Sequence, residues 1–191
     1  MNSTLSWNAM KRKVTMKTVP VYLLAGVLVW LARPAVEWFF LGLVVVLAGE
    51  AIRIWAAGHL YKNERVTTSG PYAYVKNPLY LGTFLIMVGL CVMASNYVLL
   101  GVGLGVFVAY YAPFKQRRES DRLRERFGDE WTRYDREVPG YLPRLTPYAA
   151  REARPWRWDA FIRNDEHGTA IAVLAGIGVL AWRLWSGFGR G

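Results

Sequence analysis

The stretch LYLGTFLIMVGLCVMASNYVLLGVGLGVFVAYYAPF, residues 79–114, holds two apolar segments that are separated only by Ser95 and Asn96. The two segments, 79–94 and 97–114, approach the length of about 20 residues that an α-helix needs to cross a bilayer. So short a break between two helices is typical of an antiparallel helix pair. The stretch therefore predicts a helical hairpin inside a membrane.

Three further apolar segments flank the hairpin, at residues 19–32, 36–60 and 170–185, and the first of them is short for a span. Hydrophobic residues make up 53% of the chain, a fraction that a soluble domain can also reach. Their collection into long blocks, with the charged residues between the blocks, is what indicates membrane helices. The sequence thus predicts an all-α integral membrane protein with about five transmembrane helices.

Basic residues are divided unequally between the two sides of the predicted membrane domain. Lys and Arg are concentrated in residues 1–18, 61–78 and 115–167, whereas the opposite side carries little beyond Arg33 and Arg190. Because basic residues mark cytoplasmic loops, we expect these three segments in the cytoplasm and the C-terminus outside. The net charge of +10 then fits contact with anionic membrane lipids, and no nucleic-acid partner is expected. The expected location is the inner membrane of a bacterium or archaeon.

The whole chain is expected to form one membrane domain. Its parts, in chain order, are a cytosolic tail, two spans, a cytosolic loop, the hairpin, a helical cytosolic cap and a last span, at residues 1–18, 19–60, 61–78, 79–114, 115–167 and 168–186. Within the cap, residues 115–140 alternate charges of both signs and predict a helix that extends the fourth span, with a helix end or turn at Gly128. Trp131, Tyr134 and Val138 follow at the spacing of one helical face.

The loop NERVTTSGPYAYVKNPLY, residues 63–80, is the first candidate for a functional site. Its Asn77-Pro78 step predicts a helix start in which the Asn side chain caps free backbone amides. Such amides can hold a small polar ligand, and nearby tyrosines offer surface for a flat ring. The plainer interpretation, a loop with a well-capped entry to the next span, stays open.

The charged stretch FKQRRESDRLRERFGDEWTRYDREVP, residues 114–139, is the second candidate. Lys115 and Glu119 are four apart and share a helical face at the cytosolic mouth of the fourth span. A solvated helix with ordinary ion pairs is the alternative. Inside the second predicted span, Glu50 and Arg53 are three apart and can pair, either as a structural pair or as part of a pocket.

In this order, the two stretches resemble the family of integral membrane methyltransferases that includes isoprenylcysteine carboxyl methyltransferase and phospholipid N-methyltransferase. That family has the signature TSGPYxYxRHPxYxG, followed after a hairpin by a Glu-rich segment and LxxxFGxEYxxYxxxVP. Here residues 68–82 read TSGPYAYVKNPLYLG, and the resemblance covers roughly residues 52–143. The departures are Lys76-Asn77 for Arg-His, Ser120 for the second acidic residue, and Trp131 for Tyr.

The resemblance implies a function and a set of site residues. The function is transfer of a methyl group from S-adenosylmethionine to a lipophilic acceptor in the membrane, either a prenylated carboxylate or a phospholipid headgroup, without a metal. Lys115 would face the acceptor, and Asn77 would take the place of the family His, which excludes general-base catalysis by His. The implied donor-binding residues are Glu64, Arg65, Val66, Thr67, Tyr72, Asn77, Pro78, Leu79, Tyr80 and Glu119.

Two other functions remain open at this point. One is a membrane reductase that uses NADPH, because sterol reductases resemble this family in their C-terminal spans. The other is a membrane adaptor without enzymatic activity, whose basic cytosolic tail binds anionic lipid. The single Cys91 and the widely separated His59 and His167 provide neither a disulfide nor a metal cluster.

Overall fold

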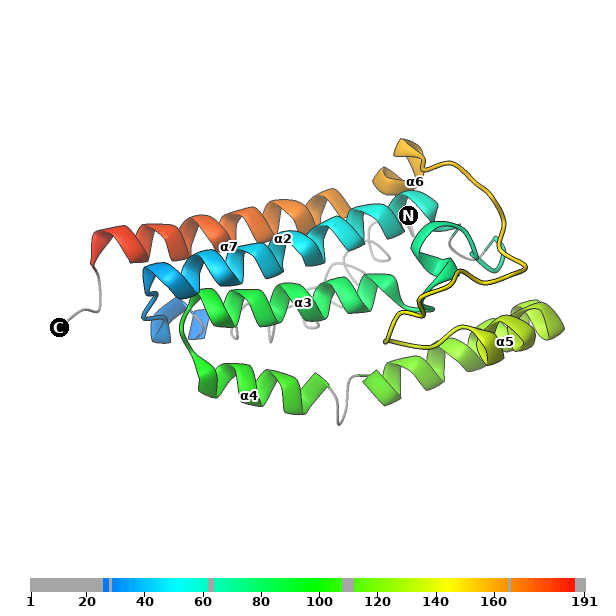
Figure 1. Cartoon of the computed structure of the whole chain (residues 1–191), viewed down its shortest axis with the longest axis horizontal. Helices are drawn as coiled ribbons and strands as arrows, with labels where there is room; N and C mark the ends of the chain where they lie inside the picture. The colour runs from blue at the N-terminus through cyan, green and yellow to red at the C-terminus, as the bar shows by residue number, and fades with distance from the viewer. Residues whose placement is uncertain (1–25, 28, 62–63, 108–111, 165, 188–191) are drawn as a thin grey trace, which may run out of the picture.

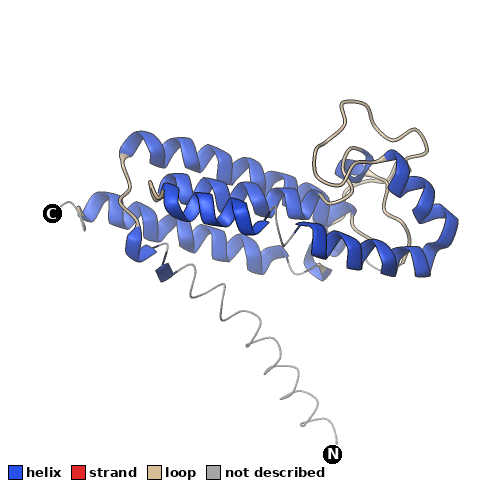
Figure 2. Cartoon of the chain, turned by 90° about the horizontal axis from the view of Figure 1, so that it is seen from below, coloured by secondary structure: helices blue, strands red, loops and turns tan. Residues whose placement is uncertain are grey.

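The computed structural model describes residues 26–27, 29–61, 64–107, 112–164 and 166–187. Within these ranges the regular structure is helical and no strand occurs (Figure 2), so the all-α prediction is confirmed. Two helices, α2 (Val36–His59) and α7 (Glu166–Ser186), are long and apolar enough to cross a membrane. Helix α3 (Pro78–Met93) is apolar but shorter. The number of five spans stays a prediction, and most of the expected first span, 19–32, lies outside the described residues.

Helices α2, α3 and α7 lie side by side and form the body of the molecule (Figure 1). The α2 and α3 backbones approach closely at two pairs of glycines. A Cβ atom on Gly89 would lie 2.7 Å from the carbonyl oxygen of Gly42, and one on Gly82 would lie 2.6 Å from that of Gly49. Small residues at such crossings allow backbones to pack directly, which is the common way of joining helices in a membrane.

The outward faces of these helices are apolar. Val44 on α2 is 65% exposed, and Ile171 and Leu174 on α7 are 65% and 66% exposed. Exposed apolar side chains on this scale would be costly in water, whereas lipid chains can cover them. The packed interior is made by a smaller set of side chains between the helices, among them Val46, Ile86, Met93, Val173 and Leu180.

The hairpin is observed at the predicted turn. Ser95 takes a positive φ of 52°, and the Asn96 side chain accepts a hydrogen bond of 2.9 Å from the amide of Leu99, which starts α4 (Tyr97–Val106). One continuous span over 97–114 stays a prediction, because residues 108–111, between α4 and α5 (Ala112–Glu137), lie outside the described residues.

The turn predicted at Gly128 is confirmed, since this residue has φ 53° and ψ −123° inside α5. The shared face of Trp131, Tyr134 and Val138 is also confirmed, because all three are buried in one cluster with Val66, Ala73 and Tyr148.

A helical cap over the whole of 115–167 is wrong in part. Between α5 and the short helix α6 (Trp158–Arg163) the chain has no helix. This stretch, residues 138–157, is rich in proline, which breaks helices. Its backbone instead bonds to the loop before α3: the amide of Lys76 to the oxygen of Pro139 at 2.8 Å, and the amide of Tyr148 to the oxygen of Ala73 at 2.8 Å.

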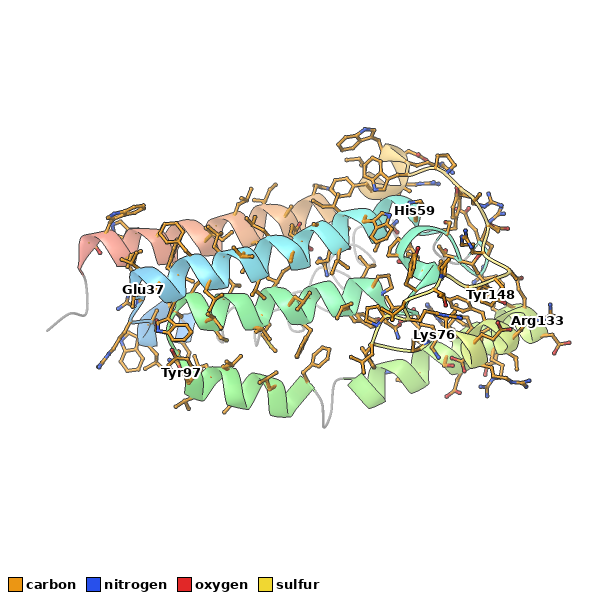
Figure 3. All side chains as sticks on the ribbon, in the orientation of Figure 1. Glu37, His59, Lys76, Tyr97, Arg133 and Tyr148 are labelled. Carbon is orange, nitrogen blue, oxygen red and sulfur yellow. The ribbon has the colours of Figure 1, made fainter. Side chains whose placement is uncertain are left out.

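The two ends of the bundle differ in charge, and this difference supports a test of topology. Glu37 and Tyr97 lie at one end, and Lys76, Arg133 and Tyr148 lie at the other (Figure 3). In a Cys91→Ala background, single cysteines at Asn96 and at Leu145 should therefore react with a membrane-impermeant maleimide from opposite sides. Labelling of both positions from the same side would contradict the predicted orientation.

Candidate functional site

A cavity of about 280 Å³ lies at the end of the bundle where α3 begins. It is enclosed by the loop before α3 and by α5, which are the two segments singled out in the sequence. Its lining combines aromatic, apolar, carboxylate and basic side chains, namely Leu60, Tyr61, Arg65, Val66, Thr67, Tyr72, Lys76, Asn77, Pro78, Leu79, Tyr80, Glu119, Arg122, Leu123, Trp131 and Tyr134.

The loop turns sharply at Gly70, and no other residue fits there. Gly70 has a positive φ of 58° and begins the 3₁₀ turn Gly70–Ala73. A Cβ atom at this position would lie 2.3 Å from Cδ2 of the buried His59 ring. The same ring lies 3.3 Å from the Ser69 hydroxyl through Nδ1. His59 is therefore a packing residue that fixes the turn from which Tyr72 enters the cavity.

Two buried tyrosines connect the loop to α5. The hydroxyl of Tyr134 donates a hydrogen bond of 2.7 Å to the backbone oxygen of Tyr72. Burial raises the pKa of both phenols, that of Tyr72 well above its ordinary value, because the phenolate would lose its hydration. Both phenols therefore stay protonated at neutral pH and serve as hydrogen-bond donors rather than as bases.

Removing the Tyr134 hydroxyl should loosen this connection. Tyr134→Phe leaves the ring in place and deprives the buried Tyr72 carbonyl of its donor, which costs about 1–3 kcal/mol of stability. Titration with SDS in mixed micelles would measure the loss. Tyr141→Phe, on a partly exposed ring, is the control, and equal stability of the two variants would contradict a structural role of the Tyr134 bond.

Glu119 presents its carboxylate at the cavity wall. The Tyr80 hydroxyl donates to Oε2 at 2.7 Å, and Arg122 lies 3.3 Å from Oε1. The Glu119 side chain is 34% exposed, so the carboxylate keeps contact with solvent while α3 holds it in place. This is a half-buried anion beside aromatic rings, and it can accept hydrogen bonds from a cationic or hydroxyl-bearing ligand.

The predicted capping role of Asn77 is wrong. Helix α3 does begin at Pro78, but the Asn77 side chain makes no capping bond. Its Nδ2 atom instead donates to the carbonyl oxygen of Gly140 at 3.1 Å. Gly140 belongs to the irregular segment after α5. Its long-range bond to Asn77 takes the place of the local capping bond. Asn77 still lines the cavity, and its amide oxygen remains an acceptor.

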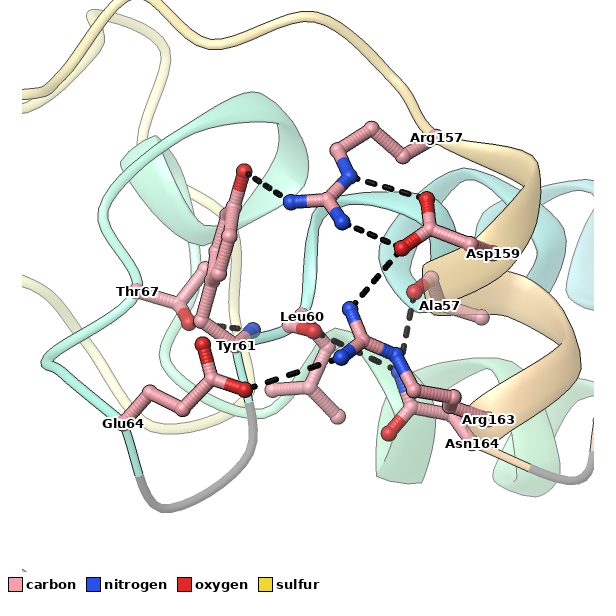
Figure 4. Close-up of polar contacts among 9 residues, drawn as sticks. All are labelled: Ala57, Leu60, Tyr61, Glu64, Thr67, Arg157, Asp159, Arg163 and Asn164. Carbon is pink, nitrogen blue, oxygen red and sulfur yellow. Dashed lines mark hydrogen bonds and ion pairs between the residues drawn. The ribbon is translucent and has the colours of Figure 1, made fainter.

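All of the predicted donor-binding residues except Glu64 line this one cavity. Glu64 is half-exposed and lies 3.8 Å from Arg163 on α6 (Figure 4). The backbone of Lys115 belongs to the first turn of α5. Its side chain is outside the described part of the structure, so its predicted role stays a prediction.

Comparison with known sequences shows a resemblance to one family over part of the chain. Residues 37–130 match the family model described as phospholipid methyltransferase. The matched segment, just under half of the chain, is similar to this methyltransferase family. The match begins in α2, crosses the loop and the hairpin, and ends after Glu119, so it contains all of the cavity lining except Trp131 and Tyr134. No solved structure matches the chain significantly.

The curated proteins that resemble this chain are of two kinds. The cobalt-zinc-cadmium resistance protein CzcN of Cupriavidus metallidurans is 31% identical over 65% of this chain and 57% of its own length. The human protein-S-isoprenylcysteine O-methyltransferase is 30% identical over 60% of this chain and 44% of its own length. The chain thus spans about half the length of these relatives. In the described part of the chain, no group of three or more His, Cys, Asp or Glu could hold a metal ion.

Tyr61 is a cavity residue that the sequence analysis did not predict. Its amide donates to the Thr67 hydroxyl at 3.0 Å, and its phenol oxygen accepts from Arg157 at 3.3 Å (Figure 4). The bond from Arg157 lowers the pKa of the phenol. The Asn164 side chain, just after α6, donates to the oxygen of Ala57 at 3.1 Å. The sequence around Tyr61 gave no sign of its bond to Arg157, because Arg157 follows 96 positions later.

The intrahelical pair expected between Glu50 and Arg53 is also wrong. Arg53 forms its ion pair with Glu166, in the first turn of α7. Both side chains are buried. The sequence did not predict Glu166 as the partner, because it lies 113 positions away from Arg53 and precedes an apolar segment. This pair contacts the cavity wall only indirectly, through α3.

Proposed function

We propose that the chain transfers a methyl group from S-adenosylmethionine to a lipid or prenylated acceptor in the membrane, and that the donor binds in the cavity between the loop and α5. The observation that carries this proposal is the meeting of both family signatures around one cavity, with the Glu119 carboxylate held by Tyr80 at 2.7 Å. The names of the human, frog, rodent and yeast relatives, all isoprenylcysteine O-methyltransferases, support methyl transfer.

The side chains around the cavity suit the donor chemically. Tyr72 and Trp131 offer aromatic surface for an adenine ring. The Glu119 carboxylate can accept hydrogen bonds from ribose hydroxyls or an amino group and can attract a cation. The volume of about 280 Å³ is near the lower end of the roughly 300–1,000 Å³ that is usual for small-molecule sites, so a bound donor would fill it.

The residues of the site point to catalysis by positioning. When bound, S-adenosylmethionine supplies a methyl group from its sulfonium, which keeps the electron pair of the broken bond and becomes a thioether. An acceptor that is already an anion or a neutral amine needs no base. This agrees with the two phenols that remain protonated and with Asn77, which cannot titrate where the family has His. The protein's part is to hold the two substrates in line and to exclude water.

Lys115 is proposed to face the acceptor. It lies one helical turn before Glu119 along α5, closer to the hairpin. Lys115→Met keeps the apolar stem and removes the charge. We expect near-normal binding of S-adenosylhomocysteine and a fall in kcat/KM for an anionic lipid acceptor. Loss of binding would move Lys115 to the donor site, and no change in either would leave it an interfacial lysine.

The activity itself can be tested with the purified protein in lipid nanodiscs and S-adenosylmethionine carrying a tritiated methyl group. We expect label in an organic-soluble product with either a prenylated cysteine or a phospholipid acceptor, and much less label with the Glu119→Gln variant at a low donor concentration. No label with either acceptor, together with oxidation of NADPH in the presence of a sterol, would replace the transferase by the reductase. If neither labelled product nor NADPH oxidation is detected, the membrane adaptor without enzymatic activity is favoured.

A further inference from the structure

Arg53 connects three helices next to the cavity. From α2, its Nη2 atom pairs with Glu166 and lies 3.3 Å from the hydroxyl of Thr169, both on α7. Its Nη1 atom donates to the hydroxyl of Thr83 and, at 3.2 Å, to the backbone oxygen of Leu79, both on α3. The side chains of Arg53 and Glu166 are only 10% and 9% exposed.

Arg53 pairs with a carboxylate on another helix and not with the nearer one on its own helix. A charge at membrane depth is costly unless it is paired, and Glu50, one turn earlier on α2, would have been enough for that. Instead the counter-ion comes from α7, and among the described residues the buried Oε2 atom of Glu50 has no hydrogen-bond partner. Neutralising Arg53 within α2 does not require α7, so the observed pairing adds a link between helices.

That link ends on the cavity wall. Leu79 lines the cavity, as do Pro78 and Tyr80 on either side of it. The Leu79 carbonyl oxygen accepts from Arg53 and, at 2.8 Å, from the Thr83 hydroxyl. The first turn of α3 therefore has the cavity on one side and the guanidinium of Arg53 on the other. This turn also lacks a side-chain cap, because Asn77 bonds to Gly140.

We propose that Arg53 and Glu166 are positioning residues, which fix the first turn of α3 and with it Leu79 and Tyr80 at the cavity. The last helix, α7, then completes the site by supplying the counter-ion. Without Glu166 the guanidinium would turn toward Glu50 or toward water and release the Leu79 carbonyl. Tyr80, which holds Glu119, would lose its fixed place. The effect on donor binding rests on the proposed function of the cavity, whereas the effect on α3 does not.

The test compares Glu166→Gln with two matched controls in the full chain. Glu50→Gln removes the carboxylate that the structure leaves out of the pair. Arg183→Met removes another buried arginine, which lies in the last turn of α7, at the opposite end of that helix from Glu166, and bonds to the backbone oxygen of Trp30 at 3.1 Å. For each variant, hydrogen–deuterium exchange of residues 77–84, affinity for S-adenosylhomocysteine and the apparent melting temperature are measured.

We expect Glu166→Gln to exchange at least tenfold faster in residues 77–84 and to bind S-adenosylhomocysteine at least tenfold more weakly. Glu50→Gln should match the wild type in both. Arg183→Met should lower the melting temperature without changing either. If Glu166→Gln does not fold, Arg53→Lys replaces it, since a lysine keeps the ion pair but cannot reach Leu79 as well.

Three results would overturn the proposal. They are exchange within twofold of the wild type in Glu166→Gln, an equal effect of Glu50→Gln, or an Arg183→Met variant that loses affinity in step with its melting temperature. A wild type that binds no S-adenosylhomocysteine would remove the proposed function instead. The exchange of residues 77–84 would still decide whether the pair positions α3.

Discussion

Glu119→Gln is expected to weaken binding of S-adenosylhomocysteine by about 1.5–3 kcal/mol, the range for a hydrogen bond to a charged group. This corresponds to roughly a 10- to 140-fold rise in Kd. The reason is that glutamine can still accept the bond that Tyr80 donates at 2.7 Å, so the wall keeps its shape while the negative charge is lost. Isothermal titration on the purified variant measures the change.

Glu125→Gln is the matched control for this prediction. Glu125 is exposed on the same helix, and the cavity lining does not include it. Its replacement should leave the affinity within twofold of the wild type, because exposed charges contribute little. If Glu119→Gln bound as tightly as the control, Glu119 would be a surface residue of α5 rather than a ligand of the donor.

Gly89→Ala is expected to destabilise the bundle by roughly 2–3 kcal/mol, the upper part of the range for an overpacked interior. The new Cβ atom would lie 2.6 Å from Cγ2 of Val46 and 2.7 Å from the oxygen of Gly42. A backbone oxygen cannot move aside as a side chain can, so α2 and α3 would have to separate. SDS titration in mixed micelles gives the change in the free energy of unfolding.

Gly101→Ala should change stability in the opposite direction. A Cβ atom at Gly101 on α4 would meet nothing within 4 Å, and alanine is a better helix former than glycine by about 0.5–1 kcal/mol. Opposite signs for the two substitutions would confirm that α2 and α3 pack through their glycines. Destabilisation by both to a similar extent would contradict this packing.

Features set by neighbouring residues could be predicted from the sequence. The Ser95-Asn96 turn, the turn at Gly128 and the buried face of Trp131 and Tyr134 each depend on residues within one or two helical turns, and each is observed.

Long-range contacts account for the rest. Asn77 has the residue type and position of a helix cap, yet its side chain donates a hydrogen bond to the backbone oxygen of Gly140, 63 positions away. Arg53 had a carboxylate three residues away and pairs with Glu166 instead. The position of the site was predicted more accurately, because two sequence signatures that are far apart in the chain form opposite walls of one cavity. Glu64 was placed in it by its sequence neighbours, although its side chain turns toward α6.

The central claim, a donor site between the loop and α5, is tested most directly by isothermal titration of the wild-type protein in detergent with S-adenosylhomocysteine. The account predicts saturable binding at one site per chain, which NADPH does not displace. Saturable binding of NADPH with no heat from S-adenosylhomocysteine would contradict it.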